Sequence, residues 1–326
     1  MPAVAAPSVV AYGLVRVEKA LVDAVRTADE FVDGVSTHLI RAGGKRQRPA
    51  MAVAAAATGG AELVTDDVIR GGVAVELVQV GSLYHDDVID EAGTRRDVES
   101  VNARWGNLVA ILAGDFLLAR ASEMAAALGT EVAGLLAATI GRMTSGEMVE
   151  IRGAFDLDRS EESYLASIAG KTAALFSASA RIGAIVAGLP RSEIDALTAY
   201  GQNYGMAFQI VDDILDVVAT DEELGKPAGH DLVEGVYTLP ILRTLANGSG
   251  AATELRRVLG RPLNDGNVAA ARDLVRAGQG VGEAVAVAES YVRSAVATLD
   301  AVGQTEATAW LAATAENLLT QAAARA

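Results

Sequence analysis

The chain has 326 residues, of which 51% are hydrophobic and only 4% aromatic, and its formal net charge is −15. This acidity argues against nucleic acid and anionic membrane surfaces as partners, because contact with many phosphates needs a net basic face. Without cysteine the chain has no disulfide, thiolate metal site or cysteine nucleophile. The histidines, at positions 38, 85 and 230, lie too far apart in sequence to favour a histidine-built metal site.

The N-terminal segment does not look like a targeting signal. Residues 1–10 contain two prolines and no basic residue, whereas a secretory signal begins with positive charge. The longest apolar stretches, such as Pro49–Ala57, are far shorter than the ~20 residues needed to span a bilayer. We therefore expect a cytoplasmic protein without a transmembrane segment, with residues 1–10 as a flexible N-terminus.

Apolar residues recur at helical spacing along nearly the whole chain. Val68, Val75 and Val78 are separated by steps of seven and three residues, and alanine, the best helix former, dominates many segments. Glycine and proline interrupt the pattern at residues 43–44, 59–60, 93, 188–190, 225–235 and 260–262. The sequence predicts about a dozen helices in one all-α domain, a helical bundle over residues 11–326.

A basic segment comes first in chain order. Arg41, Lys45, Arg46 and Arg48 place four cations within eight residues of an acidic chain. The intervening Gly43–Gly44 suits a helix C-terminus, so the segment is predicted to be an interhelical loop. Such a loop can receive an anion; the alternative is that its cations only neutralise the helix end.

The first acidic motif, His85–Asp90, ends a helix predicted to begin after Thr65. Asp86 and Asp90 are four residues apart and Asp87 and Asp90 three, so their carboxylates share one helix face and repel each other. Mg²⁺ would relieve this repulsion, because it prefers oxygen ligands. The alternative for one motif alone is a solvated acidic helix end. For His85 we favour a structural or supporting role over that of a base.

A second motif repeats the spacing 126 residues later, at Asp212, Asp213 and Asp216 within Phe208–Asp216. Two such faces on apolar helices would oppose each other across a bundle interior and need cations between them. Further cations follow the motifs along the chain. They are Arg95–Arg96, Lys171 beside Thr172, and Lys226 in a glycine-rich loop.

These motifs, in this order between about residues 40 and 245, resemble the trans-polyprenyl diphosphate synthases, the family that makes farnesyl, geranylgeranyl and longer prenyl diphosphates. The resemblance implies a helical bundle of the isoprenoid synthase type, with a deep central cavity and usually a homodimer. It implies a prenyltransferase that condenses isopentenyl diphosphate with an allylic diphosphate, using about three Mg²⁺ ions.

The same resemblance implies residue roles. Metal ligands would be Asp86, Asp87, Asp90, Asp212, Asp213 and Asp216. The allylic diphosphate would be bound by Arg95, Lys171, Thr172, Gln209 and Lys226. Isopentenyl diphosphate would be bound by Lys45, Arg48, Gln79 and Arg96.

Three positions depart from the commonest family pattern. Gln79 stands where many long-chain members have a histidine, and its amide can still donate to a phosphate oxygen. Val236 replaces a lysine that would contact a diphosphate, and Asp97 replaces a glycine after the arginine pair.

Product length is predicted from helix geometry. A tail growing from metals at Asp86–Asp90 would run back along the same helix, past Gly81 and towards Val78 and Ala74, at ~5.4 Å per turn. Glycine at position 81, where short-chain members often have an aromatic residue, offers no floor, so we expect a product longer than fifteen carbons. The alternative is that Gly81 only allows close helix packing.

Two other functions remain as alternatives: a terpene cyclase-like enzyme and a non-catalytic subunit of a heteromeric prenyl synthase. Cyclases normally carry a mixed second metal motif, and inactive subunits tend to have lost aspartates. Both aspartate motifs and the basic loop are intact here, which favours the synthase.

Overall fold

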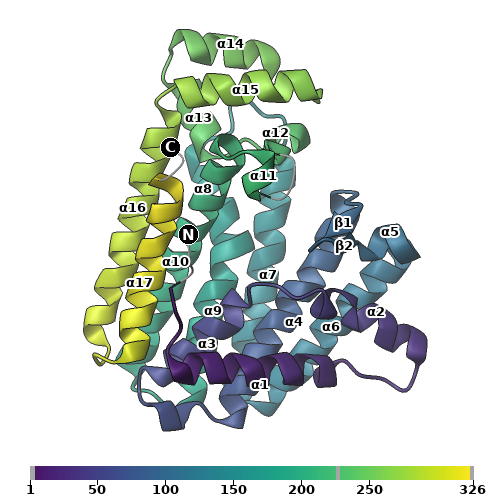
Figure 1. The fold of residues 1–326 in the computed structure, drawn as a ribbon, viewed down its shortest axis with the longest axis vertical. Helices are drawn as coiled ribbons and strands as arrows, with labels where there is room; N and C mark the ends of the chain where they lie inside the picture. Colours follow the sequence, from purple (N-terminus) through teal and green to yellow (C-terminus); the bar gives the residue numbers. More distant parts are fainter. Residues whose placement is uncertain (1–3, 225–227, 324–326) are drawn as a thin grey trace.

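Two long and largely buried helices, α4 (Asp66–Ile89) and α10 (Arg191–Val218), organise the computed structural model, which describes residues 4–224 and 228–323. Helix α4 packs against α3 (Gln47–Ala57), α6 (Asn107–Ala127) and α9 (Ala174–Val186). Helix α10 packs against α9, α16 (Gly280–Thr298) and α17 (Glu306–Ala323). Figure 1 shows these helices side by side, as the all-α prediction requires.

Helix α4 carries apolar residues on every face, as expected for a helix surrounded by others. Val68, Val75 and Leu77 are all fully buried. Thr65 occupies the N-cap position, as predicted, and the first turn carries Asp66 and Asp67, whose charges suit a helix N-terminus. The helix ends at the first aspartate motif, so that motif lies at one end of a buried rod.

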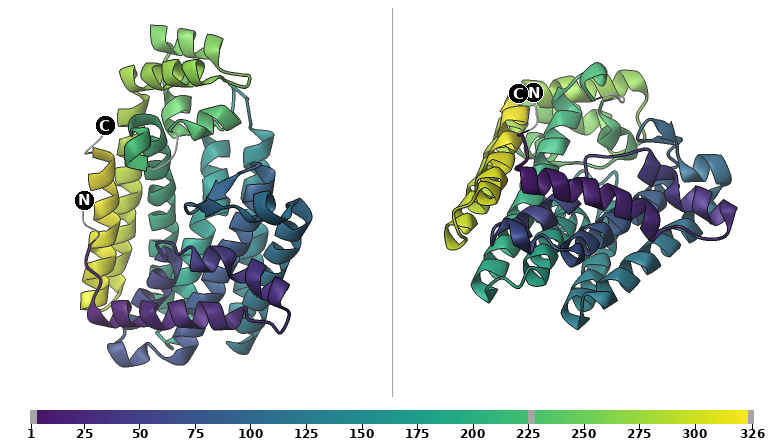
Figure 2. Two further views of the ribbon diagram at one scale, coloured as in Figure 1. Left: turned by 45° about the vertical axis from the view of Figure 1, so that its right-hand side comes forward. Right: turned by 60° about the horizontal axis from the view of Figure 1, so that its bottom comes forward.

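Helix α1 (Ser8–Ala24) crosses the ends of the central helices, and α2 (Glu30–Arg41) follows it (Figures 1 and 2). Pro7 precedes the first turn of α1, and Val10 in that turn is buried. The helix therefore begins inside the segment predicted to be flexible. The domain boundary at residue 11 stays a prediction.

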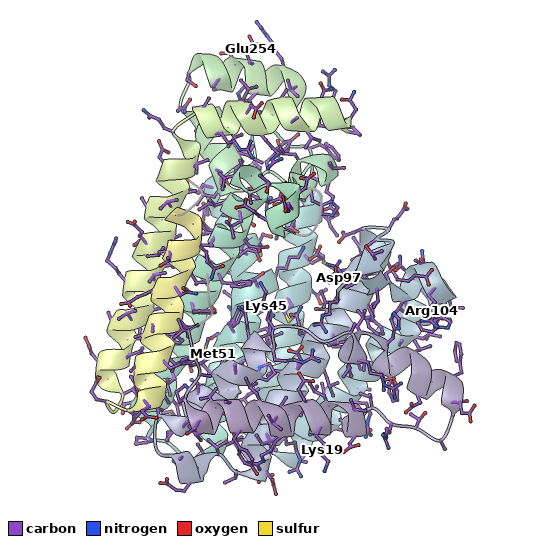
Figure 3. The ribbon with its side chains drawn as sticks, viewed as in Figure 1. Lys19, Lys45, Met51, Asp97, Arg104 and Glu254 are labelled. Carbon is purple, nitrogen blue, oxygen red and sulfur yellow. The ribbon has the colours of Figure 1, made fainter. Side chains whose placement is uncertain are left out.

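A short hairpin, β1 (Thr94–Arg95) and β2 (Val98–Glu99), follows α4 and leads to α5 (Val101–Trp105). Its two turn residues, Arg96 and Asp97, both have positive φ, 54° and 62°. Asp97 is labelled at this hairpin in Figure 3. Aspartate tolerates the left-handed conformation better than most side chains, which explains how Asp97 fits where glycine is usual.

The remaining elements complete the bundle. They are η1 (Ala61–Leu63), α7 (Thr130–Arg152), α8 (Glu161–Ile168), the π-helical turn η2 (Ala169–Ala173), α11 (Asp221–Leu224), α12 (His230–Glu234), α13 (Leu239–Ala246), α14 (Gly250–Val258), α15 (Asp265–Ala277) and η3 (Leu299–Ala301). Helices α14 and α15 lie across the end of the bundle opposite α1 (Figure 1).

Most of the predicted glycine and proline breaks fall between helices. The break predicted at residues 225–235 is wrong in part, because α12 (His230–Glu234) forms within it, and its residues 225–227 are outside the described ranges. The described residues carry more helices than the dozen predicted, because several, such as α5, α11 and α12, are only one turn or so long. Within residues 4–224 and 228–323, no helix has both the length and the apolar character needed to cross a membrane.

Candidate active site

The basic loop joins α2 to α3 through residues with positive φ. Gly43 and Gly44 have φ of 90° and 140°, and Arg46 adopts a left-handed conformation with φ of 47°. The Arg46 guanidinium is buried and pairs with Glu18 at 2.5 Å and Glu76 at 2.9 Å. Arg46 therefore holds the loop in place, whereas its neighbour Lys45 is exposed (Figure 3).

Arg48 and Arg96 lie close to the same loop. The Arg48 guanidinium stacks over the Phe176 ring, 4.5 Å from its centroid, and its Nε has no hydrogen-bond partner. Burial lowers the pKa of Arg48 to about 10, although Glu76 opposes this shift. Arg96 donates to the Leu39 carbonyl at 2.8 Å and lies 3.6 Å from Glu76. Arg48 and Arg96 thus both interact with Glu76, and their assignment to isopentenyl diphosphate stays a prediction.

Glu76 was not among the predicted site residues, yet it neutralises this arginine cluster. It is 2% exposed and lies in the otherwise apolar middle of α4. A carboxylate among apolar residues of a buried helix needs a positively charged partner. The apolar residues around Glu76 in the sequence were therefore the signal that could have identified it.

The three aspartates of the first motif do not share one environment. Asp87 is fully buried and accepts a 2.7 Å bond from Arg95 Nε, whereas Asp86 is half-buried and Asp90 is exposed at the C-cap of α4. Asp87 is therefore held by Arg95, and Asp86 and Asp90 remain the accessible pair of this motif.

Burial perturbs both accessible carboxyl groups. Desolvation raises the pKa of Asp86 to about 7, with Lys171 opposing the shift and Glu147 adding to it. Desolvation likewise raises the pKa of Asp90 to about 6, and Glu234 of α12 adds to this shift. These interactions place α7, η2 and α12 around the end of α4.

Lys171 lies on the π-helical turn η2, a distortion often found at functional sites. Its ammonium group pairs with Glu147 at 2.8 Å and also with Glu150, both on α7. Burial alone would lower the pKa of Lys171, but the two glutamates outweigh it and raise that pKa. Sequence reasoning missed both glutamates, although their i, i+3 spacing put them on one helix face.

The second motif is anchored by neutral donors. Asp213 accepts from the Tyr164 hydroxyl at 2.5 Å and from Gln209 Nε2 at 2.8 Å, and Thr172 donates to Gln209 Oε1 at 2.7 Å. Burial raises the pKa of Asp213 to about 8. Asp212, one residue earlier, is exposed. The chain of hydrogen bonds thus joins the predicted residues Thr172, Gln209 and Asp213, and adds Tyr164.

The last aspartate of this motif lies beneath α12. Asp216 is 5% exposed and accepts from the backbone N–H groups of His230 at 3.4 Å and Asp231 at 3.3 Å. Its own carbonyl accepts from Gly229 N at 2.9 Å. Asp216 therefore fixes the first turn of α12, which carries Glu234 towards the first motif.

Two cavities adjoin these groups. A small one of about 90 Å³ is lined by Glu150, Lys171, Thr172, Gln209, Asp213, Val236 and neighbouring residues. A larger one of about 520 Å³ lies beside Lys45 and Asp212 and is bounded by apolar residues of α10 and α17. The predicted diphosphate ligand Lys226 lies outside the described residues.

The donor set suits Mg²⁺, because every candidate ligand is a carboxylate oxygen. The buried Asp87 Oδ2 has no hydrogen-bond partner, leaving an acceptor available at the first motif. In the part of the chain that the structure describes, no three acidic or histidine side chains are already arranged as a metal site. Such ions would therefore need further oxygens, as a diphosphate can supply.

The predicted chain-length residues lie on α4 before the first motif. A Cβ atom at Gly81 would lie 3.2 Å from the Gly114 carbonyl and 3.3 Å from the Leu118 side chain, so α6 packs closely there. Val78 and Ala74 are buried in the core, and Gln79 is half-buried. The close packing corresponds to the alternative stated for Gly81, and the tunnel wall stays a prediction.

His85 lies between the same two helices. Its Nε2 is 3.2 Å from the Ile111 carbonyl and 3.4 Å from Asp115, both on α6. A side chain at Gly114 would collide with the imidazole, so the pair is closely fitted. This placement agrees with a supporting role.

Comparison with known proteins decides the family. The polyprenyl synthetase family model matches residues 29–275. The chain belongs to the polyprenyl synthetase family. It is 40% identical to the nonaprenyl diphosphate synthase of Mycobacterium tuberculosis, over 87% of this chain and 84% of that protein. It is 37% identical to heptaprenyl diphosphate synthase component 2 of Geobacillus stearothermophilus, over 90% and 91% of the two chains.

Solved structures of the family share the fold. A polyprenyl synthase from Caulobacter crescentus CB15, in complex with calcium and isoprenyl diphosphate, superposes with a TM-score of 0.89 at 33% identity, covering 95% of each chain. The chain is thus a polyprenyl diphosphate synthase, a prenyltransferase with a single all-α domain.

Proposed function

We propose that this synthase condenses isopentenyl diphosphate with an allylic diphosphate in a Mg²⁺-dependent reaction and releases a trans-polyprenyl diphosphate longer than fifteen carbons. The observation that carries the proposal is the position of Lys171, which lines one cavity with Asp213 and interacts electrostatically with Asp86. One cationic side chain thus lies between the two aspartate motifs. The names of the nonaprenyl and heptaprenyl synthases support a long product.

In this proposal Asp86, Asp90 and Asp212 hold about three Mg²⁺ ions, because they are the accessible members of the two motifs. The buried members support them. They are Asp87, Asp213 and Asp216. Mg²⁺, when bound, would neutralise the charge that develops on a diphosphate leaving group.

The other polar residues divide between two anions. The allylic diphosphate is assigned to Arg95, Lys171, Thr172, Gln209 and Lys226. Isopentenyl diphosphate is assigned to Lys45, Arg48, Gln79 and Arg96. Lys171 can pass from Glu147 and Glu150 to an arriving diphosphate, since both kinds of partner are oxyanions within reach of its flexible stem.

The chemistry needs no protein nucleophile. The allylic carbon–oxygen bond breaks and its electron pair leaves with the diphosphate, whose charge the surrounding cations stabilise. The double bond of isopentenyl diphosphate then forms a new carbon–carbon bond to the allylic cation. A proton is finally lost, and we assign its acceptor to the released diphosphate rather than to His85.

We also propose a homodimer formed through α6. This helix exposes Leu108 by 71%, Leu112 by 59% and Ile111 by 42%, and the neighbouring α7 exposes Met148 by 60%. Contiguous exposed apolar residues of this kind mark association surfaces. Leu112→Glu should shift the particle to half its mass in light scattering. If the wild type is monomeric until another protein is added, the name of the heptaprenyl component offers the heteromeric alternative.

A cytoplasmic location is part of the proposal, because a chain without cysteine forms no disulfide and so has no need of an oxidising compartment. The direct test of function is incubation with labelled isopentenyl diphosphate, an allylic starter and Mg²⁺, followed by chromatography of the dephosphorylated products. Products beyond fifteen carbons are expected. A cyclic hydrocarbon would identify the cyclase-like alternative, and no product without a second protein would identify the subunit alternative.

Gly81→Phe tests the path of the tail. If the tail passes Gly81, the product should shorten to about farnesyl length while the first condensations continue. If Gly81 only permits α6 to approach, the variant should lose thermal stability and keep the wild-type product. Measuring product length and melting temperature on the same sample separates the two.

A further inference from the structure

Arg159 is a buried cation without adequate partners. It lies in the loop between α7 and α8, is 6% exposed, and makes one long bond, 3.5 Å, from Nη1 to the Tyr237 carbonyl. Its Nε and Nη2 atoms are buried with no hydrogen-bond partner. A guanidinium in this condition requires compensation by nearby negative charge or by a ligand.

The surroundings of Arg159 belong to the active site. The guanidinium carbon lies 5.8 Å from the centroid of the Tyr164 ring, and the Tyr164 hydroxyl donates to Asp213. Burial lowers the pKa of Arg159, and the groups that oppose this shift are, in decreasing order, Glu150, Tyr164, Asp213 and Asp156. Two of these carboxylates, Glu150 and Asp213, line the small cavity, and only Asp156 lies outside it.

The small cavity has an excess of negative groups. Its walls include the carboxylates of Glu150, Asp231 and Glu234 and the carboxyl group of Asp213, against the ammonium group of Lys171. Val236 occupies the wall next to Tyr237, the residue that Arg159 contacts, and supplies no charge. Thr238 Oγ1 also lines the cavity and is buried without a partner. Arg159, which does not line the cavity, interacts electrostatically with two of its acidic residues, Glu150 and Asp213.

We propose that Arg159 is a positioning residue for the half of the site that binds metal and diphosphate, supplying from beneath the cavity the fixed positive charge that Val236 does not supply at its wall. Arg159 touches no reactant. It acts through Tyr164 and the field at Glu150 and Asp213, which is strong because little water separates these buried groups. The inference rests on the function proposed above.

The test is an isothermal calorimetric titration of the full-length enzyme with inorganic pyrophosphate at a fixed Mg²⁺ concentration. It measures the dissociation constant of pyrophosphate without turnover. Arg159→Gln should weaken pyrophosphate binding by about tenfold, the order expected for loss of one charge at this range in a partly desolvated site. Arg152→Gln removes a charge from the exposed end of α7 and should bind like the wild type. Arg159→Lys keeps the charge and should stay within about threefold.

A rescue experiment distinguishes whether Arg159→Gln weakens pyrophosphate binding through loss of charge or through altered packing. Val236→Lys in the Arg159→Gln background should recover most of the lost affinity, because it returns a cation to the same cavity. In steady-state assays the Michaelis constant for the allylic substrate should follow the same order, while that for isopentenyl diphosphate stays unchanged.

Unchanged pyrophosphate binding in a folded Arg159→Gln protein would overturn the inference, as would failure of Val236→Lys to rescue it. If the glutamine variant does not fold, Arg159→Lys decides: a folded lysine variant with binding weakened tenfold or more rejects a role for charge. If the wild type itself does not bind pyrophosphate with Mg²⁺, the proposed function fails instead, so the two failures are distinguishable.

Discussion

The two aspartate motifs have identical spacing, yet the middle and last aspartates of one motif have different surroundings from their counterparts in the other. The middle aspartate of the first, Asp87, is held by the cation Arg95, whereas Asp213 of the second is held by the neutral donors Tyr164 and Gln209. The last aspartate of the first motif, Asp90, is exposed at the end of α4. Its counterpart Asp216 is buried and accepts hydrogen bonds from backbone N–H groups in the first turn of α12.

The difference shows what each motif contributes. The first motif ends its helix, so its accessible carboxylates lie at an open rim. The second lies within hydrogen-bond networks that extend to η2 and α12. We infer that the carboxylates of the first motif can change position when a ligand binds. The second motif also holds η2 and α12 in position.

The largest expected effect is a loss of catalytic rate when the accessible aspartate at the start of either motif is replaced. Asp86→Ala and Asp212→Ala should each lower kcat by about a thousandfold or more, since several kcal/mol of charge stabilisation would be lost with a metal ligand. Circular dichroism should show unchanged helicity. Asp300→Ala, an exposed aspartate in η3, is the matched control. Near-wild-type rates in either variant at saturating Mg²⁺ would remove that motif from the metal site.

The next largest expected effect is a loss of stability when the middle aspartate of the first motif, Asp87, loses its charge partner. Arg95→Ala leaves the fully buried Asp87 carboxylate without its charge partner and should lower the free energy of unfolding by about 3 kcal/mol. In an Asp87→Asn background the same change should cost much less. Chemical denaturation of the four proteins gives the coupling energy; a coupling near zero would show that Arg95 does not stabilise Asp87.

Tyr164→Phe is the corresponding change at the second motif. It removes the hydroxyl that donates to Asp213 but leaves Gln209 in place, so we expect a loss of about 1–2 kcal/mol in unfolding free energy. Tyr291→Phe, at a partly buried tyrosine of α16, serves as the control. A loss as large as that of Arg95→Ala would contradict the distinction between ionic and neutral anchoring.

Asp216→Ala should remove the cap of α12 and cost about 1 kcal/mol, while Asp90→Ala should leave stability nearly unchanged. Thermal unfolding without metal measures both. Amide exchange should also become faster in residues 230–234 for the first variant only. Equal exchange in the two variants would show that Asp216 does not hold this helix.

Much of this arrangement could be predicted from the sequence. Apolar periodicity gave the helices, Thr65 marked the start of α4, and the glycine and proline positions gave the breaks. Local spacing also placed Asp86 and Asp90 on one side of α4. These features depend on neighbouring residues, which a sequence displays directly.

Long-range partners could not be predicted in the same way. Spacing alone treats Asp87 as equivalent to its neighbours, whereas the hairpin brings Arg95 back to it from eight residues away. Arg46 and Lys45 look alike in the basic loop, but only Arg46 meets Glu18 and Glu76. Which cation is buried depends on elements 28 and 30 residues away in the chain.

The last expected effect is a change in how the free energy of unfolding depends on pH without metal. The pKa of Asp86 is raised by burial to about 7 in the folded protein, well above the ordinary aspartate value of 3.8. Between these values the folded protein binds more protons than the unfolded chain, so this group makes stability fall as pH rises. Asp86→Asn should therefore gain stability relative to the wild type as pH rises from about 4 to about 7, and the gain should level off above the folded pKa of Asp86.

Asp213→Asn extends the comparison to the second motif. Burial raises the pKa of Asp213 to about 8, so the relative gain of this variant should continue to higher pH than that of Asp86→Asn. Thermal unfolding from pH 5 to 9 in chelator measures both differences. Parallel curves for wild type and Asp86→Asn would mean that the Asp86 carboxyl is as well solvated in the fold as in the unfolded chain. The first motif would then be open to water even without its metals, and burial would separate the two motifs more sharply than the present structure indicates.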